Sequence, residues 1–531
     1  MAGILNKLIA IISFYLYANV PLFGRDVEFQ EKELVYISNF LSSIQSYVHP
    51  AFDWIPSTNI SSETLSDVFS AKDLLSIANR FSGKLLLREE MKIEEVLWNE
   101  LTETGMLQAV EAIESRWWGW RCRRCGNKLR RMFAEIPCAR CNQTHIYCRN
   151  CVEMGRVLEC QQLYVWTGPP PKWPVQEEAC RWDGELTHAQ QQASDRIRGV
   201  MERGAGELLT WAVCGAGKTE MLFAGIGGSL EAGKRVCLAT PRADVVRELL
   251  PRFRQAFPGT SISALYGGSE EKAADGQLVL ATTHQLLRFA RAFDILIIDE
   301  IDAFPYHNDP SLPFATSRAA KIGASRIYLT ATPRKEQRRR LEHGQLDCVF
   351  VPIRFHGCLL PVPRLIFSNK MKKDLQKNMP PVAFFDWLRQ RRHPERQLLV
   401  FVPYVELAGK MEKAIGPLLR KEWGELAIAS VHAADEDREK KVQQFRNREL
   451  QLLITTTILE RGVTFPSVDV VVLDSGHEVF DEAALVQIAG RAGRSPDDPD
   501  GEVLFFHAGK TRSMVAAVRS IKEMNNRAVK F

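Results

Sequence analysis

The sequence predicts an α/β protein with two parallel-sheet lobes, preceded by a cysteine-rich module and a mainly helical N-terminal segment. Short β-rich apolar runs alternate with longer helical patterns beyond about residue 186, and a Pro-rich stretch at 352–367 interrupts this alternation. Upstream, three C-x-x-C pairs fall close together. Strands separated by helices form parallel sheets that are covered on both faces. Two such runs joined by a hinge therefore predict two lobes.

The length and composition agree with a multidomain globular protein. A chain of 531 residues is too long for one ordinary core. Hydrophobic residues make up 45% and charged residues 25%, which excludes a wholly disordered or collagen-like chain. The formal net charge of +5 is compatible with a polyanionic partner.

The N-terminal segment, residues 1–113, is expected to be mainly helical, because Ile93, Val96, Leu97 and Leu101 recur at helical spacing. It carries no catalytic pattern. We place the remaining boundaries at 114–165 for the cysteine-rich module, 166–180 for a Pro-rich linker, and 181–350 and 351–531 for the two lobes.

One stretch near the start, Leu8 to Phe23, is apolar enough to suggest membrane contact. It is shorter than the ~20 residues of a spanning helix and contains Asn19 and Pro21. A partly buried amphipathic segment is therefore favoured over a loose membrane anchor. We expect a cytoplasmic protein, and attachment to the inner face of the cell membrane stays open.

The cysteine-rich module contains half of the twelve cysteines of the chain, in the pairs Cys122/Cys125, Cys138/Cys141 and Cys148/Cys151. Such clustering in a long chain favours a metal in a reducing compartment over disulfides. Two C-x-x-C pairs supply four thiolates to one tetrahedral Zn²⁺. Three pairs are one more than a single site needs, and Cys160 is available for a second site. On spacing alone, a ribbon of the first two pairs is one solution. We expect this module to unfold by itself when a ligand is lost, leaving the lobes folded.

Basic and aromatic side chains surround the first pair. Arginines can meet phosphates and tryptophans can stack bases, so this patch is a candidate for DNA contact. Packing of the small module by one or two tryptophans is the competing explanation. The residues concerned are Arg116, Arg121, Arg123, Arg124, Arg130, Arg131, Trp117, Trp118 and Trp120.

A phosphate-binding loop is predicted in the first lobe, where TWAVCGAGKTEML reads as a strand, a turn and a helix start. Glycines let backbone N–H groups face phosphates at a helix N-terminus. Lys218 would meet the β and γ phosphates of ATP, and the hydroxyl of Thr219 would ligate Mg²⁺. The first glycine of the usual pattern is replaced by Ala212. The candidate nucleotide-binding residues are Gln190, Gly215, Ala216, Gly217, Lys218, Thr219 and Glu220, with Gln190 suited to hydrogen-bonding adenine.

Asp299 and Glu300 follow four apolar residues in FDILIIDEID. Carboxylates at the carboxyl end of a parallel strand lie in the ligand crevice. We expect Asp299 to hold Mg²⁺ and Glu300 to polarise the attacking water.

The second lobe contributes ALVQIAGRAGR, where Gln487, Arg491 and Arg494 are spaced three or four residues apart. This spacing predicts one shared helix face. Arginines in this position can stabilise charge on the γ phosphate when the lobes close. Together with Lys218, Asp299 and Glu300, these three residues complete the predicted catalytic set.

The motifs VCGAGKTE, ATPR, TTHQLL, DEID, TAT, TTTILERGVTF and QIAGRAGR stand in the order of the superfamily 2 helicase motifs. With DEIDAFPY, SALYGG, VQQFR and the cysteine cluster, the chain resembles the ComFA family of late competence proteins. The resemblance implies two RecA-like lobes and a DNA-stimulated ATPase that draws single-stranded DNA into the cytoplasm during transformation.

The same resemblance implies further site residues and partners. It favours the outer pairs, Cys122, Cys125, Cys148 and Cys151, as the zinc ligands. It implies that Thr330 and Thr332 link the ATP state to lobe movement. DNA-phosphate contacts would come from Thr240, Arg242, Thr282, Thr283, Thr455, Thr456 and Thr457. The implied partners are single-stranded DNA, the competence protein ComFC, the membrane DNA channel and recombination mediators.

Two other functions stay open at this point. An RNA helicase would use the same motifs, and a non-catalytic scaffold would use ATP binding to assemble the uptake machinery. The intact residues Lys218, Glu300 and Arg494 argue against the scaffold. The sequence leaves both a monomer and a homo-oligomer open.

Overall fold

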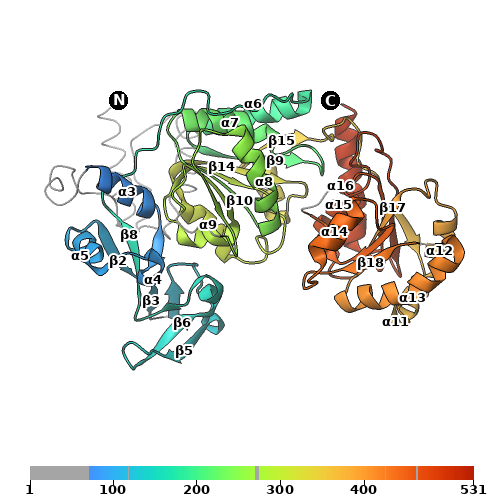
Figure 1. The fold of residues 1–531 in the computed structure, drawn as a ribbon, viewed down its shortest axis with the longest axis horizontal. Coiled ribbons are helices and arrows are strands. Elements are labelled where there is room, and N and C mark those ends of the chain that lie inside the picture. The colour runs from blue at the N-terminus through green and yellow to red at the C-terminus, as the bar shows by residue number, and fades with distance from the viewer. Residues whose placement is uncertain (1–70, 118, 270–273, 425, 462–464, 531) are drawn as a thin grey trace, which may run out of the picture. The chain divides into compact units, whose positions relative to one another are not determined.

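The computed structural model describes residues 71–117, 119–269, 274–424, 426–461 and 465–530. It confirms the predicted fold class, with two parallel-sheet RecA-like lobes that follow a cysteine-containing N-terminal part (Figure 1). The apolar stretch Leu8 to Phe23 and Trp118 lie outside the described residues. Within the described ranges, no helix has the length and apolar character needed to cross a bilayer.

The first lobe is built on a seven-stranded sheet in the order β11-β12-β10-β13-β14-β9-β15, with all its strand pairs parallel. Every apolar run that we expected to form a strand here does so, and β15 is an additional edge strand. The strands are β9 (Gly206–Ala212), β10 (Val236–Thr240), β11 (Ile262–Leu265), β12 (Leu278–Thr282), β13 (Phe293–Ile298), β14 (Ala320–Thr330) and β15 (Asp347–Val351). The helices are α6 (His188–Arg203), α7 (Glu220–Glu231), α8 (Ala243–Ala256), α9 (Ser311–Ala319) and α10 (Lys335–Glu342).

Different elements pack on the two faces of this sheet. Leu208 packs with residues of α6, α7 and α8, whereas the next residue, Leu209, packs with α9 and with the buried cysteines of the N-terminal part. This alternation follows from the two-residue period of a strand. The cysteine-rich module thus shares a hydrophobic core with the first lobe, and its unfolding by itself on loss of a ligand stays a prediction.

The second lobe has a six-stranded parallel sheet in the order β16-β21-β20-β17-β19-β18. One face packs on α14, α15 and α16, and the other on α11, α12 and α13. The strands are β16 (Arg364–Phe367), β17 (Gln397–Phe401), β18 (Ile428–Val431), β19 (Leu452–Thr455), β20 (Val468–Val472) and β21 (Val503–His507). The helices are α11 (Met371–Gln376), α12 (Val382–Arg389), α13 (Val405–Trp423), α14 (Arg438–Arg446), α15 (Glu482–Ala489) and α16 (Arg512–Ala528).

The described part of the N-terminal segment mixes helices with strands. The helix predicted from the spacing of Ile93 to Leu101 is α5. It does not extend further, because the chain turns at Gly105 and continues as β2. Strand β8 pairs with both β1 and β2, so one small sheet crosses the boundary that we placed at residue 113. The elements are α3 (Ala71–Phe81), β1 (Leu85–Leu87), α4 (Arg88–Met91), α5 (Glu95–Glu103), β2 (Leu107–Glu111), β3 (Ile113–Arg116), β4 (Gly119–Cys122), β5 (Phe133–Pro137), β6 (Thr144–Cys148), β7 (Val157–Leu158) and β8 (Gln162–Trp166).

The Pro-rich linker has no helix or strand beyond Trp166, the last residue of β8, but its middle contacts the first lobe. The guanidinium of Arg235 lies 4.7 Å from the ring centroid of Trp173. Gln277 Nε2 donates to the Pro174 carbonyl at 3.1 Å, and Gln176 Nε2 donates to Gln277 Oε1 at 2.9 Å. These contacts attach the linker to the lobe surface rather than leaving it as a free spacer.

Candidate active site and cysteine clusters

The phosphate-binding loop connects β9 to α7, in the order that the sequence predicts. Gly215 and Gly217 have φ values of +81° and +68°, which only glycine adopts without strain. Lys218 and Thr219 follow directly, at the N-terminus of α7. Glu220, the first residue of α7, forms an ion pair with Arg252 of α8. The loop therefore presents backbone N–H groups and a lysine where phosphates would bind.

Gln190 lies in the first turn of α6 and is buried. Its Oε1 accepts from the Thr187 N–H at 2.8 Å, and its Nε2 donates to the carbonyl of Ala216 at 2.9 Å. The side chain thus joins the helix start to the phosphate-binding loop. Binding of adenine by Gln190 stays a prediction.

Asp299 and Glu300 lie at the carboxyl end of β13, next to the loop. Burial raises the pKa of Asp299 to about 6, although the charge of Lys218 acts in the opposite direction. Glu300 has a φ of +52°, a strained conformation for a residue with a side chain. Its N–H donates to Asp299 Oδ1 at 2.8 Å, and its Oε2 lies 3.6 Å from Arg461 Nη1.

Asp302, the last residue of DEID, joins the two lobes, a role that the sequence analysis missed. Its carboxylate accepts hydrogen bonds from Thr330 at 2.6 Å, Thr332 at 2.8 Å and Arg461 Nη2 at 2.6 Å. Arg334 Nη2 donates to its main-chain carbonyl at 2.6 Å. Burial opposes ionisation of Asp302, but Arg461 and the hydroxyls hold its pKa well below the usual range. Arg461 belongs to ERG in the second lobe, so this carboxylate connects the TAT motif to that lobe.

Other ion pairs connect the lobes beside Asp302. Arg334 bonds Asp481 at 2.6 Å and Arg338 bonds Glu482 at 2.6 Å, both at the start of α15. Arg242, which we expected at a DNA phosphate, instead donates through Nη2 to the Ile458 carbonyl at 2.9 Å. These pairings could not be predicted from the sequence, because the partners of the arginines are distant along the chain.

We had expected Gln487, Arg491 and Arg494 to share one helix face. The structure shows that they do not. Helix α15 ends at Ala489, and Gly493 takes a φ of +61°, so both arginines lie in the turn that follows. Gln487 Oε1 accepts from the thiol of Cys214 in the phosphate-binding loop at 3.1 Å. A side chain at Gly490 would overlap Cys214, with an added Cβ only 2.4 Å from the cysteine Cβ. The glycine thus allows the turn to approach the loop closely.

Three arginines gather beside Cys214 at this turn. Burial and the charge of Arg494 lower the pKa of Arg491 well below its usual value. The same two causes lower the pKa of Arg354 to about 10. Arg491 Nε donates to the Glu460 carbonyl at 3.0 Å, while its buried Nη1 has no hydrogen-bond partner among the described residues. Like charges that disfavour one another in a buried place are relieved by an anion between them.

Arg354 is the third arginine, and sequence analysis missed it. It lies in the Pro-rich stretch between the lobes and is fully buried. Its guanidinium donates to the carbonyls of Ala492, at 2.8 Å, and Gly493. The following residue, Phe355, donates its N–H to the Gly215 carbonyl at 3.0 Å. The stretch between the lobes therefore hydrogen-bonds both to the turn that carries Arg491 and to the phosphate-binding loop.

Most threonines expected to contact DNA are buried. This holds for Thr240, Thr282, Thr283 and Thr455. The hydroxyl of Thr455 donates to the Val431 carbonyl at 3.2 Å. Thr456 and Thr457 are half-buried, so they are the members of this set with surface available to a strand.

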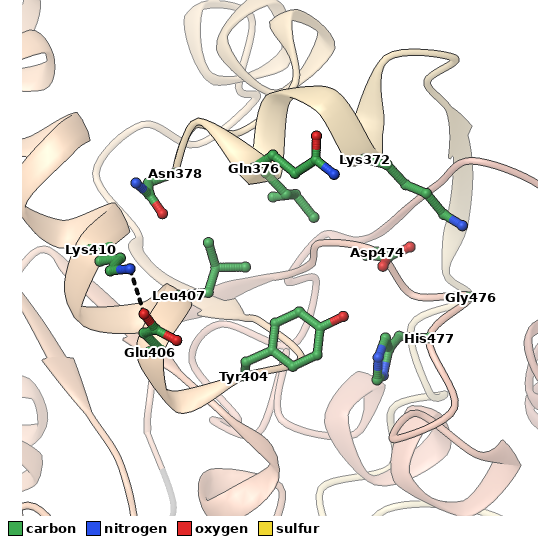
Figure 2. A pocket seen from close by; sticks show the side chains of 11 residues that line it. Lys372, Gln376, Asn378, Tyr404, Glu406, Leu407, Lys410, Asp474, Gly476 and His477 are labelled. Atoms are coloured by element: carbon green, nitrogen blue, oxygen red, sulfur yellow. Dashed lines mark hydrogen bonds and ion pairs between the residues drawn. The ribbon is translucent and has the colours of Figure 1, made fainter.

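A cavity of about 580 Å³ lies in the second lobe, at the carboxyl ends of β17 and β20. Figure 2 shows the ring of Tyr404 facing His477, with Lys372 on the opposite wall; the two ring centroids are 4.8 Å apart at an interplanar angle of 84°. Ligand crevices in parallel sheets lie at this edge. An aromatic pair beside a lysine is suited to a nucleic-acid base and its phosphate.

The four cysteines of the outer pairs come together, and all are buried. Cys122 Sγ lies 3.7 Å from Cys151 Sγ, and Cys125 Sγ lies 3.5 Å from Cys148 Sγ. Tetrahedral zinc with Zn–S bonds of about 2.3 Å requires S···S separations of about 3.8 Å. The geometry therefore fits a Cys₄ metal site. Cys138 and Cys141 are not part of this cluster, so the alternative ribbon is not formed.

The basic patch around this cluster divides into two kinds of residue. Arg124 is fully buried and bonds Glu90 at 2.6 Å, so it is not available to DNA. Arg123 lies within ion-pair distance of Glu111, and Trp120 packs on Phe133. The exposed members of the patch among the described residues are Arg116, Trp117, Arg130 and Arg131.

Comparisons with known proteins agree with this architecture. The family model described as Competence protein ComFA N-terminal domain matches residues 69–165, which span the small sheet and all three cysteine pairs. Models described as Type III restriction enzyme, res subunit, and Helicase conserved C-terminal domain match residues 183–335 and 382–496.

Among curated proteins, the chain is 45% identical to Competence protein ComFA of Bacillus subtilis, over 84% of this chain and 94% of that protein. It is 39% identical to Competence protein ComFA of Streptococcus pneumoniae, over 75% and 93%. A more distant relative is the ATP-dependent DNA helicase RecG of Haemophilus influenzae, 24% identical over 53% of this chain and 42% of RecG. The chain belongs to the ComFA family of competence proteins.

Proposed function

We propose that this protein is an ATP-dependent translocase that binds single-stranded DNA and drives it into the cytoplasm during genetic transformation. The proposal assigns ATP and Mg²⁺ to the cleft between the lobes. Lys218 and the loop glycines would hold the phosphates, and Thr219 and Asp299 would ligate Mg²⁺, which neutralises charge on the phosphates. Glu300 would orient and polarise the attacking water.

The observation that carries the proposal is the group of buried arginines opposite the phosphate-binding loop. Arg354, Arg491 and Arg494 each interact electrostatically with Cys214 of the loop and have lowered pKa values. A triphosphate between loop and turn would supply negative charge beside Arg354 and Arg491, whose printed hydrogen bonds are to main-chain carbonyls. Since the arginines come from the second lobe and the hinge, ATP would favour the closed arrangement of the lobes.

Hydrolysis would be coupled to lobe movement through Asp302. It lies three residues beyond Asp299 and bonds both Thr330 and the second-lobe residue Arg461. A change of charge at Asp299 and Glu300 alters the electrostatic environment of this contact directly. This short path supports the role that the family resemblance assigns to Thr330 and Thr332.

DNA is favoured over RNA because the chain has ComFA relatives and a relative named as a DNA helicase. The cavity beside Tyr404, His477 and Lys372, and the half-buried Thr456 and Thr457, would contact the strand without reading its sequence. A scaffold without catalysis is disfavoured, because binding alone does not require Glu300. By resemblance, partners would be ComFC, the membrane DNA channel and recombination mediators.

The Cys₄ cluster would hold a structural Zn²⁺ through Cys122, Cys125, Cys148 and Cys151. The four thiols are buried and lie together at the spacing that a tetrahedral zinc ion requires. Because the cluster shares a core with α9 and the sheet of the first lobe, the metal would stabilise that lobe as well as the module.

The decisive experiment measures ATP turnover by the full chain with single-stranded DNA, duplex DNA or RNA added in turn. We expect the largest stimulation with single-stranded DNA. Glu300→Gln should retain nucleotide binding and lose turnover by roughly 10²–10⁴-fold, since the amide cannot polarise water. Displacement of streptavidin from biotinylated single strands then tests movement. Greater stimulation by RNA would favour the RNA helicase, and wild-type displacement by Glu300→Gln would refute the assigned role.

A further inference from the structure

A second cysteine cluster lies outside the Cys₄ site. Cys138, Cys141 and Cys160 have thiols that all lie within 4.8 Å of one another. The sulfur atoms of Cys138 and Cys160 are 3.7 Å apart, the separation found between Cys122 and Cys151 in the first cluster. His145 Nε2 lies 3.0 Å from the thiol of Cys141. Three thiols thus meet at one place, and an imidazole contacts one of them.

The Cys138 loop has the same backbone geometry as the loop of the first cluster. At Cys122, the N–H donates to the Asn127 carbonyl at 3.0 Å, and the Cys122 carbonyl accepts from the Gly126 N–H at 2.8 Å. At Cys138, the N–H donates to the Gln143 carbonyl at 2.8 Å, and the Cys138 carbonyl accepts from the Asn142 N–H at 2.9 Å. The two loops are therefore equivalent knuckles.

The left-handed residue of each knuckle strengthens this equivalence. It is Gly126, with φ +74°, in the first and Asn142, with φ +55°, in the second. Asparagine is one of the few residues with a side chain that adopts this conformation readily. The second loop therefore keeps the knuckle conformation without a glycine.

The strand register brings the other two side chains to this knuckle. The loop closes the hairpin of β5 and β6, in which Pro137 pairs with Thr144. On the other side of β6, Cys148 pairs with Val157, and the Glu159 N–H donates to the Ile146 carbonyl at 2.8 Å. Strand β7 ends at Leu158, and Cys160 lies in the turn that follows, which the Gln161 N–H closes by donating to the Leu158 carbonyl at 3.2 Å. The four potential ligands thus come from three neighbouring segments: two from the loop, one from β6 and one from the turn after β7.

We propose that Cys138, Cys141, Cys160 and His145 form a second zinc site, of the Cys₃His type. Three cysteines and one histidine are a common tetrahedral ligand set for structural zinc. The imidazole now contacts Cys141 and needs a side-chain rotation to come equally close to all three thiols. The odd number of thiols argues against a disulfide as the purpose of the cluster, since one would always remain unpaired.

The two sites should differ in how firmly they hold metal. The Cys₄ thiols are all buried, whereas Cys141 and Cys160 are exposed. Exposed ligands are accessible to chelators and oxidants. We expect the second zinc to leave first when a chelator is added, and its loss to open the hairpin tip without reaching the core of the first lobe.

Metal analysis of the purified full chain tests the stoichiometry. We expect two zinc ions per chain in the wild type and in the control Cys348→Ser, whose cysteine belongs to neither cluster. Cys160→Ser should contain one. One zinc in the wild type, or an unchanged content in Cys160→Ser, would overturn the proposal.

Cobalt substitution identifies the ligands and detects misfolding. Co²⁺ alone, added to metal-free protein, should give thiolate charge-transfer bands and ligand-field bands from two different sites. Cys160→Ser should keep only the Cys₄ spectrum, which shows that the module is still folded. His145→Cys should retain two metals and shift the second spectrum towards that of a Cys₄ site. A second spectrum unchanged in His145→Cys would exclude the imidazole as a ligand. Because no arm measures ATP turnover, the result is independent of the proposed translocase activity.

Discussion

Two groups of charged side chains face the cleft between the lobes, and they are satisfied in different ways. At the lobe contact, Arg461 is surrounded by Asp302, Glu300 and Glu460, and these carboxylates outweigh burial and raise its pKa. At the phosphate-binding loop, Arg491 bonds a backbone carbonyl, and burial beside Arg494 lowers its pKa.

Arg461, with its carboxylate partners, stabilises the structure, whereas Arg491, with its main-chain partner, is placed to bind an anion. A buried arginine with carboxylate partners is a completed interaction, and removing a partner costs stability. A buried arginine with main-chain contacts and a positive neighbour is costly until an anion arrives. Substitutions at the loop should therefore reduce catalysis with little loss of stability, and substitutions at the lobe contact should reduce stability.

Lys218→Ala should give the largest effect, with no detectable ATP hydrolysis. The lysine supplies the positive charge at the β and γ phosphates, where negative charge must be held in the transition state. Turnover and thermal unfolding of the purified variant are measured together. Loss of turnover with an unfolding temperature close to wild type would support a role of the loop in catalysis and not in stability. Wild-type-like turnover would remove Lys218 from the site.

Arg494→Ala should lower turnover by roughly 10³-fold or more, the scale of an arginine that stabilises a transferring phosphoryl group. Binding of a fluorescent ATP analogue to the first lobe should change much less. Arg494→Lys provides the matched control: it restores charge without the planar fork and should recover only part of the rate. Complete loss of nucleotide binding in Arg494→Ala would indicate a structural role instead.

Asp302→Asn should act mainly on stability. It leaves Arg461 with fewer charges to offset its burial, and breaking a buried ion pair costs roughly 3–5 kcal/mol. Because the pKa of Asp302 is held below its usual value, its contribution is complete above about pH 4 and is lost as the pH falls through the folded-state pKa. Chemical unfolding at pH 5 and pH 8 should show the same loss at both. A loss present only at pH 8 would contradict this assignment.

Arg338→Ala should have the smallest effect. Its ion pair with Glu482 also joins the lobes, but both side chains are partly exposed, and such pairs contribute about 0–1 kcal/mol. We expect turnover within about twofold of wild type and a nearly unchanged unfolding temperature. A change as large as that of Asp302→Asn would mean that the lobe contact depends on the number of ion pairs and not on burial.

The strands and the two loop motifs of the lobes could be predicted because their signals are local. Runs such as DILIID are apolar throughout, and GAGKT places glycines where the backbone needs them. The edge strands β15 and β16 escaped prediction because they are partly exposed and lack a continuous buried pattern.

Contacts between distant segments could not be predicted. Asp302 and Arg461 are ordinary charged residues in the sequence, and their importance depends on which surfaces the lobes bring together. The helical spacing of Gln487, Arg491 and Arg494 was misleading, because α15 ends at Ala489, before both arginines. The cysteine pairs were visible, but only the fold shows which sulfurs meet.

The pairing of β2 with β8 gives the cysteine-rich module a particular place in the chain. Glu111 and Gln162 are partners in that pairing, so everything between them leaves and re-enters at one point of the small sheet. A short turn could bridge this point, and the module could be excised without breaking the order of the strands. Its removal would instead uncover the first lobe at α9, where Phe314 lies against Gly126 and Arg318 Nη1 donates to the Arg123 carbonyl at 2.9 Å. In a shortened protein of this kind, the uncovered apolar side chains of α9 would have to be replaced by polar ones. That helix is therefore the place to redesign when the module is deleted.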